Sequence, residues 1–322
     1  MGFKESNNFF ILILRTARPR QWLKNLSLYA AILFGGNFFD RQSFYTVSMA
    51  FVIFCGISSA IYIINDVVDA AHDRAHPFKK IRPIASGKLS RIKATLTAIL
   101  LLSIFLYSAS KIGAYFLGIA SLYVVLQLAY SLVLRNIIII DALTVAAGFI
   151  LRVIAGSVAV LTSISSWLIL STIGISMLLA FGKRRSEKTL LAGQPAREQA
   201  IRVLTRSTLS HYPDNLLDSM ISMSASFVII TYAFFTFQIS SKLAPKFILN
   251  ILPPTLAQPK WMMLSIPFVI YGVARYLYVI YEKKGGESPE RVLLSDKPLL
   301  ITVVCWFFLI LLIIYSAVDA AN

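Results

Sequence analysis

Charged residues are scarce in this sequence, and acidic residues are the scarcest. Of the 322 residues 14% are charged, whereas a soluble protein carries roughly 25%. This shortage argues against a soluble core, because the chain has too little polar surface to cover one. There are two cysteines, Cys55 and Cys305, and both lie within apolar runs. Their placement argues against a disulfide and says nothing about the redox compartment.

Apolar residues are abundant instead. They make up 57% of the chain, and the mean hydropathy is +0.72. A helix needs about 20 mostly apolar residues to span a membrane, so lipid can solvate what one soluble core could not bury. We therefore predict an all-α, polytopic membrane bundle of nine transmembrane helices that forms one domain over residues 1–322. The predicted spans are 22–39, 44–64, 91–109, 113–134, 137–160, 164–182, 218–240, 261–281 and 298–318.

The basic residues gather on one side of this predicted bundle. With the N-terminus inside, 24 of the 31 Lys and Arg lie in or beside the cytoplasmic segments and five lie outside. By the positive-inside rule we expect a multi-pass plasma-membrane protein with a cytoplasmic N-terminus and an external C-terminus. The net charge of +16 then needs no nucleic acid, which we do not expect as a partner. The long cytoplasmic connections are 65–90, 183–217 and 282–297.

The N-terminal segment reads as an interfacial helix rather than a signal peptide. Its apolar stretch, Phe9–Leu14, is short, is followed by Arg15, and has no small-residue cleavage site. We expect residues 1–21 to form an amphipathic helix at the membrane surface, so the lipid bilayer is itself a partner of the chain. The sequence is compatible with a homo-oligomer.

Acidic and amide side chains crowd the inner end of the second predicted span. Asn65, Asp69 and Asp73 are spaced i, i+4 and i+8, which places them along one face of a helix, and Asp66 lies one residue further round. Carboxylate and amide oxygens suit Mg²⁺, which usually takes one or two carboxylates together with substrate phosphate oxygens. The alternative is a charged helix end that is merely solvated. A cluster this dense in an acid-poor chain favours a magnesium site.

A cationic stretch follows the acids directly. Its basic residues include Arg74, Lys79, Lys80 and Arg82. Acids that hold a metal, followed by bases that hold phosphate, form the arrangement that a departing diphosphate needs. The sequence therefore predicts a diphosphate-binding active site on the cytoplasmic side.

Several segments carry a resemblance to a known family. The run from Asn65 to Asp73 resembles the first aspartate-rich motif of the UbiA superfamily of intramembrane prenyltransferases, whose architecture has nine spans. Further segments resemble its decaprenyl-phosphate phosphoribosyltransferase branch, and jointly they extend from residue 18 to about residue 300. They are Arg18–Asn25, Asp73–Gly87, Leu134–Asn136, Ala147–Gly156, Phe181–Glu187 and Ser288–Asp296.

The resemblance implies roles for individual residues. It implies that Mg²⁺ joins the diphosphate of a donor to Asn65 and Asp69, with Asp73 a further ligand or a partner of the ligands. The residues expected to act in catalysis are Asp66, Asp69 and Asp73. Arg135 stands where the family usually has Lys. The residues expected to bind substrate are Lys24, Tyr62, Lys79, Arg82, Arg135, Arg152, Lys183 and Arg184.

Some of these assignments have structural alternatives. Arg152 lies within an apolar span, where a charge is costly unless it is paired or faces a cavity. It either lines a pocket or pairs with Asp141, which lies on the same helical face. Lys183 and Arg184 either contact donor phosphates or act as a positive-inside signal. Asp214 and Asp218 either hold a second metal or cap the following helix. The 282–297 connection either closes over the donor or is an ordinary connector.

The sequence is consistent with two functions, and both need the magnesium site. The first, which the resemblance implies, moves a 5-phosphoribosyl group from phosphoribosyl diphosphate to a polyprenyl phosphate. The second moves a polyprenyl chain from its diphosphate to an aromatic or other acceptor. The surplus of cations favours the first, because a ribose 5-phosphate needs additional positive charge. A transporter would place charges through the bilayer midplane and show internal repeats, which the sequence lacks. The polyprenyl chain length does not follow from the residues.

Overall fold

The structure is a computed structural model, and it describes residues 8–75, 79–192, 212–239, 260–282 and 289–318. Parts of the predicted N-terminal segment and of the connections 65–90, 183–217 and 282–297 lie outside the described residues. All regular elements among the described residues are helical, as predicted. The shorter ones are α1 (Phe9–Ala17), η1 (Pro19–Tyr29), α2 (Ala30–Phe34), α4 (Ala70–Ala75), η2 (Lys79–Ile81), η3 (Leu134–Asn136) and α14 (Pro289–Ser295).

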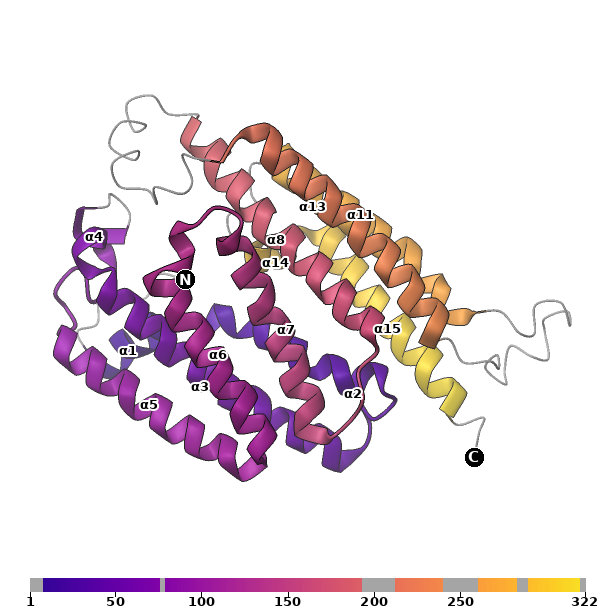
Figure 1. Ribbon diagram of the computed structural model, residues 1–322, viewed down its shortest axis with the longest axis horizontal. Coiled ribbons are helices and arrows are strands. Elements are labelled where there is room, and N and C mark those ends of the chain that lie inside the picture. The colour runs from indigo at the N-terminus through magenta and orange to yellow at the C-terminus, as the bar shows by residue number, and fades with distance from the viewer. Residues whose placement is uncertain (1–7, 76–78, 193–211, 240–259, 283–288, 319–322) are drawn as a thin grey trace, which may run out of the picture.

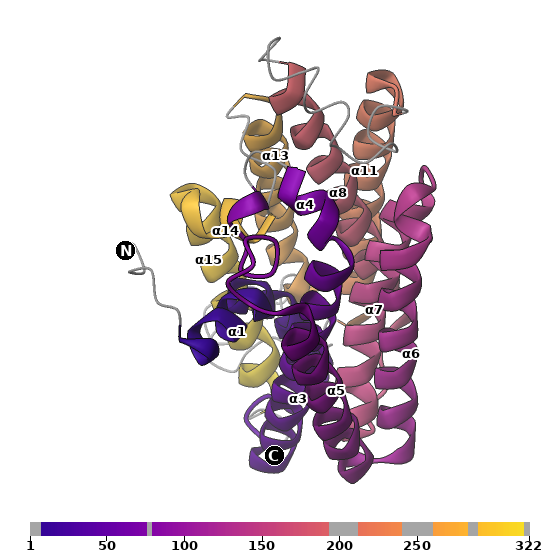
Figure 2. The same cartoon turned by 90° about the vertical axis from the view of Figure 1, so that its left-hand side faces the viewer.

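Eight helices among the described residues are long and apolar enough to cross a membrane. In Figure 2 these long helices run side by side, and α1 lies at an angle to them. They are α3 (Arg41–Val68), α5 (Arg91–Ile112), α6 (Ala114–Leu132), α7 (Ile140–Val160), α8 (Ser166–Ala192), α11 (Asp214–Ile239), α13 (Ile266–Tyr281) extended by η5 (Trp261–Ser265), and α15 (Lys297–Val318).

The first predicted span, 22–39, is not one long α-helix. It is replaced by the 11-residue 3-10 helix η1 and the 5-residue α2. A 3-10 helix rises about 2.0 Å per residue and an α-helix about 1.5 Å, so the two together are about 30 Å long. That length equals the hydrocarbon thickness of roughly 30 Å. Eight of the predicted spans therefore correspond to helices that are long and apolar enough to cross a membrane, and a ninth crossing through η1 and α2 stays a prediction.

The bundle has two halves (Figure 1), and each half has its own apolar core. Helices α3, α6, α7 and η1 pack through a cluster that includes Leu28, Phe54 and Tyr123. Helices α8, α11 and α13 pack through a second cluster that includes Phe181 and Ile221. Helices α7 and α8 pack against each other and join the halves. Apolar side chains on the outside of the helices are exposed, as lipid-facing residues are.

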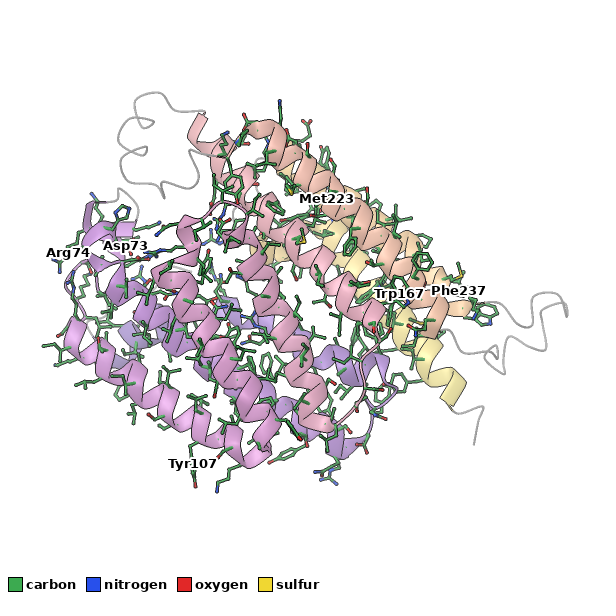
Figure 3. All side chains as sticks on the ribbon, viewed as in Figure 1. Asp73, Arg74, Tyr107, Trp167, Met223 and Phe237 are labelled. Carbon is green, nitrogen blue, oxygen red and sulfur yellow. The ribbon has the colours of Figure 1, made fainter. Side chains whose placement is uncertain are left out.

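The two ends of the bundle differ in chemistry (Figure 3). Asp73 and Arg74 lie at one end of the molecule, whereas Trp167 and Phe237 lie at the other. This separation agrees with a polar face on one side and aromatic side chains near the opposite interface. Helix α8 continues beyond its predicted end at 182, so the basic residues 183–185 belong to a helix rather than to a loop.

Glycine at position 156 lets η1 lie directly on α7. A Cβ at Gly156 would stand 1.9 Å from the backbone oxygen of Leu28. We expect Gly156→Ala to lower the free energy of unfolding by about 1–3 kcal/mol, because a backbone cannot yield as a side chain can. Gly118→Ala in α6 is the matched control, since its Cβ would meet nothing within 4 Å. Unfolding in mixed micelles measures both, and equal stability of the two variants would contradict the close packing.

Candidate active site

The predicted acidic face lies where α3 ends. Helix α3 ends at Val68 with Asp69 as its C-cap, and α4 begins at Ala70. Helical hydrogen bonds nevertheless continue across this break, with Asp69 N donating to Asn65 O at 2.9 Å and Asp73 N donating to Asp69 O at 2.8 Å. The predicted i, i+4, i+8 order of Asn65, Asp69 and Asp73 is therefore present in the backbone.

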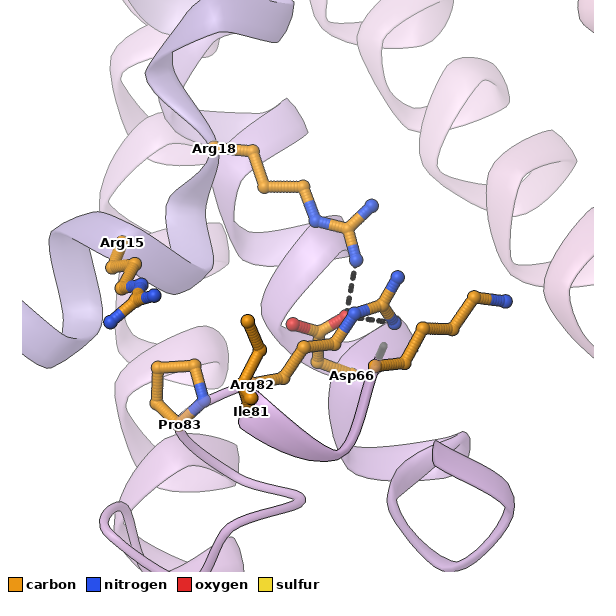
Figure 4. A pocket seen from close by; sticks show the side chains of 7 residues that line it. Arg15, Arg18, Asp66, Ile81, Arg82 and Pro83 are labelled. Carbon is orange, nitrogen blue, oxygen red and sulfur yellow. Dashed lines mark hydrogen bonds and ion pairs between the residues drawn. The ribbon is translucent and has the colours of Figure 1, made fainter. Parts of the chain in front are cut away.

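Two of the acids are buried and held by arginines. Asp66 accepts from Arg18 Nη2 at 2.5 Å and from Arg82 Nη1 at 3.1 Å. Arg82 Nη1 also donates to Asp73 Oδ2 at 2.6 Å. The side chains of Asp66 and Asp73 are each only 3% exposed. Figure 4 shows Arg18 and Arg82 converging on Asp66, one from the segment before α3 and the other from the segment after it.

Asp69 and Asn65 have more open surroundings. The Asp69 side chain is 25% exposed, and its Oδ1 lies 2.9 Å from Arg135 Nη1. Asn65 Oδ1 accepts a hydrogen bond from Ser131 Oγ at 2.6 Å, which leaves a second lone pair on that oxygen. Of the three acids, Asp69 is the one that an incoming ligand reaches most easily.

A cavity of about 250 Å³ adjoins this face (Figure 4). It is lined by four cations and one carboxylate, together with Ile81 and Pro83. The excess of positive charge favours the binding of an anion there. The charged lining residues are Arg15, Arg18, Asp66, Lys79 and Arg82.

Further predicted substrate-binding residues lie around the same end. Tyr62, one turn before Asp66, lies under Arg18, whose guanidinium carbon is 5.3 Å from the ring centroid. Lys24 of η1 and Lys183 of α8 are close enough for their charges to interact. Lys183 also lies 3.8 Å from Glu187 Oε1, so an acid already balances part of this positive charge.

Arg184 is bound within the protein rather than open to substrate. Its side chain is 7% exposed, and it donates to Asp141 Oδ2 at 2.7 Å and to Glu187 Oε2 at 2.8 Å. Asp141 also accepts from the Tyr212 hydroxyl at 2.5 Å. Burial raises the pKa of the Tyr212 phenol, so this group stays protonated and continues to donate. The observed partners of Arg184 are thus acids of the protein itself. Its predicted contact with substrate is not tested and stays a prediction.

The suggested pairing of Arg152 with Asp141 is wrong, because Asp141 binds Arg184. Arg152 is buried and donates to three neutral oxygens: Asn25 Oδ1 at 2.8 Å, Gly148 O at 3.0 Å and Tyr123 Oη at 2.6 Å. Its guanidinium also stacks on the Tyr123 ring. Among the described residues no acid pairs with it. Arg152 therefore ties η1 to α6 and α7, and its predicted contact with substrate stays untested.

The second acidic pair is engaged with basic residues of α8. Asp214 lies 2.8 Å from Lys188 Nζ, and Asp218 lies 2.8 Å from Arg185 Nε. Asp218 also accepts from the Tyr281 hydroxyl at 2.7 Å. Asp214 is the first residue of α11, and its role as a helix cap stays a prediction. A second metal at these two acids stays a prediction.

Comparison with known proteins identifies the family. Residues 26–184 match the model of the UbiA prenyltransferase family. A decaprenyl-phosphate phosphoribosyltransferase of Corynebacterium glutamicum is 33% identical over 307 residues, which cover 94% of this chain and 86% of that protein. This chain belongs to the UbiA prenyltransferase family. It is accordingly a membrane transferase, as the sequence predicted.

A second curated relative carries the same name as the first, and a solved structure has the same fold. A decaprenyl-phosphate phosphoribosyltransferase of Mycolicibacterium smegmatis is 33% identical to this UbiA protein over 91% of its chain and 89% of the relative. A UbiA homologue of Archaeoglobus fulgidus, solved with GPP and Mg²⁺ bound, superimposes with a TM-score of 0.67. It is 17% identical and covers 94% of this chain and 99% of its own, so it shows the fold alone.

The oxygen atoms at the inner end of α3 fit a magnesium ion that takes some of its ligands from the protein and the others from a bound substrate. Among the described residues no three His, Cys, Asp or Glu side chains come together as a metal cage. Mg²⁺ rarely uses such a cage, and it takes one or two carboxylates plus phosphate oxygens. Asn65 and Asp69, one turn apart, supply an amide oxygen and an accessible carboxylate of that kind. Asp73, which faces Arg82, is less accessible, and its role as a ligand stays a prediction.

Sequence reasoning missed several residues of this UbiA site. Arg18 binds Asp66 from 48 positions away, and Ser131 binds Asn65 from 66 positions away. No local spacing could indicate these pairs. Arg15 of α1 also lines the cavity. The sequence had placed this residue only in an interfacial helix and had given it no role in the site. The available signal for Arg15 and Arg18 was their charge at the end of an otherwise apolar helix.

Proposed function

We propose that this protein transfers a 5-phosphoribosyl group from phosphoribosyl diphosphate to a polyprenyl phosphate, with Mg²⁺ as cofactor. One observation carries the proposal: three carboxylates and three arginines converge at one end of the bundle beside a cation-lined cavity. The relatives named as decaprenyl-phosphate phosphoribosyltransferases support the choice of substrates.

The residues of the chain divide the work of such a transfer. Departure of diphosphate from the anomeric carbon leaves positive charge on the sugar and negative charge on the leaving group. Lys79, Arg82 and Arg135 would bind the diphosphate more strongly as its charge grows, which lowers the barrier. A bound Mg²⁺, held by Asn65 and Asp69, would supply Lewis-acid neutralisation of the same charge. The lipid phosphate is already anionic, so the attack needs no strong general base.

The number of cations favours a phosphoribosyl donor over a prenyl donor. A prenyl diphosphate carries one diphosphate and an apolar chain, whereas phosphoribosyl diphosphate carries an additional 5-phosphate. Lys24 of η1 and Lys183 of α8 lie near each other at the same end of the bundle, and Lys183 also lies 3.8 Å from Glu187 Oε1. We assign these two lysines to the 5-phosphate.

The orientation in the membrane follows from the same charges. We place the N-terminus and the active site on the cytoplasmic side of the plasma membrane and the C-terminus outside, since the arginines and lysines of the site lie at one end of the spans. A water-soluble donor is then reached from the cytoplasm, and the lipid acceptor from the bilayer. A homo-oligomer is compatible with this arrangement.

A transfer assay tests the proposed function. Purified protein in detergent is incubated with Mg²⁺, a polyprenyl phosphate and phosphoribosyl diphosphate labelled in the ribose. We expect label in the lipid phase, and we expect chelation of Mg²⁺ to abolish it. A parallel reaction offers a labelled prenyl diphosphate with aromatic acceptors. Label transferred only in this second reaction would overturn the proposal in favour of a prenyltransferase.

A further inference from the structure

We propose that Arg15 and Arg18 form the subsite for the phosphate group of the acceptor lipid, an isoprenoid monophosphate. This inference rests on the proposed function, which assigns cations to the donor but none to the acceptor. The evidence lies in the cavity of about 250 Å³ and in the helix that forms one of its walls.

Helix α1 is a membrane-surface helix. Its buried residues Leu12, Thr16 and Ala17 face the protein, where Leu12 packs with residues of α3 and α5 such as Ile63 and Ala98. Its apolar residues on the opposite side remain exposed. The exposed fraction is 78% for Phe10 and 52% for Leu14. A helix with one face on the protein and an apolar face outside it lies in the headgroup region of a bilayer.

The cavity therefore lies where lipid headgroups lie. Arg15, which follows the exposed Leu14, lines the cavity from α1. Ile81 lines it from η2 and is 64% exposed. An apolar rim beside a cationic interior suits an amphiphile that has a phosphate at one end and a hydrocarbon chain at the other.

The charges of the cavity leave room for such an anion. Arg82 is shared between Asp66 and Asp73, and Arg18 binds Asp66. Arg15 pairs with no acid among the described residues. Arg82 is thus the cavity arginine most engaged with acids, whereas Arg15 is the one that no described acid neutralises. Arg18 has a left-handed backbone (φ 54°) at the turn from α1 into η1, and this turn places both arginines on one cavity.

Binding of short soluble analogues tests the subsite independently of catalysis. The full-length protein in detergent is titrated with farnesyl phosphate, and binding is followed by calorimetry. We expect Arg15→Gln to weaken binding about tenfold, which corresponds to the loss of one charge-assisted contact. Arg20→Gln is the matched control, because Arg20 is an exposed arginine five residues away that does not line the cavity. We expect it to bind as the wild type does.

Three competitors identify the ligand. Farnesol, which lacks the phosphate, should not bind at the subsite, and inorganic phosphate and phosphatidylglycerol should each compete at least tenfold more weakly than farnesyl phosphate. Equal binding by Arg15→Gln, equal competition by inorganic phosphate, or equal competition by phosphatidylglycerol would each overturn the proposal. A wild-type protein that binds farnesyl phosphate through Arg15 yet transfers no phosphoribosyl group would leave the subsite intact and refute the proposed function.

Discussion

Asp69→Asn is expected to lower the transfer rate at least about 100-fold while the protein stays folded. Asp69 is the most exposed of the three acids at the inner end of α3, at 25%. We assign its carboxylate to the metal ion that would neutralise the leaving diphosphate. Asparagine has nearly the same shape but no charge, so it weakens the hold on a divalent cation. The loss of its bond to Arg135 costs little stability, because both side chains are partly exposed.

The measurement compares Asp69→Asn with Asp40→Asn in the same assay. Asp40 caps the opposite end of α3 and is exposed, and asparagine is an equally good N-cap. We expect the control to keep wild-type activity. Size-exclusion profiles and thermal unfolding in detergent establish that both variants are folded. An active Asp69→Asn protein would refute the assignment of the site, and one that fails to fold would make Asp69 a structural residue.

Hydropathy predicted the spans well because each depends on its own composition. A helix in lipid must satisfy its backbone internally, so a run of about 20 apolar residues is sufficient evidence. The segment 22–39 is also mostly apolar, although it contains Lys24, Asn25 and Asn37, and η1 takes the 3-10 form there. Its geometry depends on long-range contacts, such as the one between Asn25 and Arg152 and the close approach of Leu28 to Gly156. Composition alone contains no information on these contacts.

The acids of the site could be predicted, but their partners could not. Arg152 and Asp141 share a helical face, being 11 residues apart, but a rise of 1.5 Å per residue separates them by about 16 Å along α7. A shared face is therefore not a contact. The true partners come from other helices, and only the fold brings them together.

The buried pair of Asp141 and Arg184 gives the second large effect. We expect Asp141→Asn to lower the free energy of unfolding by about 3–5 kcal/mol. The Asp141 side chain is 1% exposed and that of Arg184 is 7% exposed, so water cannot replace the lost partner. The variant leaves Arg184 with Glu187 alone among its observed acid partners, and it also removes the charged acceptor of Tyr212.

The control for this prediction is a more exposed ion pair, which the next residue of α8, Arg185, forms with an acid of α11. Arg185 pairs with Asp218, and their side chains are 21% and 38% exposed. Asp218→Asn should cost less than about 1 kcal/mol, because solvent screens an exposed pair. Unfolding by SDS in mixed micelles measures both variants. If burial is the cause, the double variant Asp141→Leu with Arg184→Met should recover most of the lost stability, since it removes both charges together. A double variant no more stable than Asp141→Asn would instead indicate that the network of Asp141, Tyr212 and Glu187 holds α7 and α8 together through its hydrogen bonds.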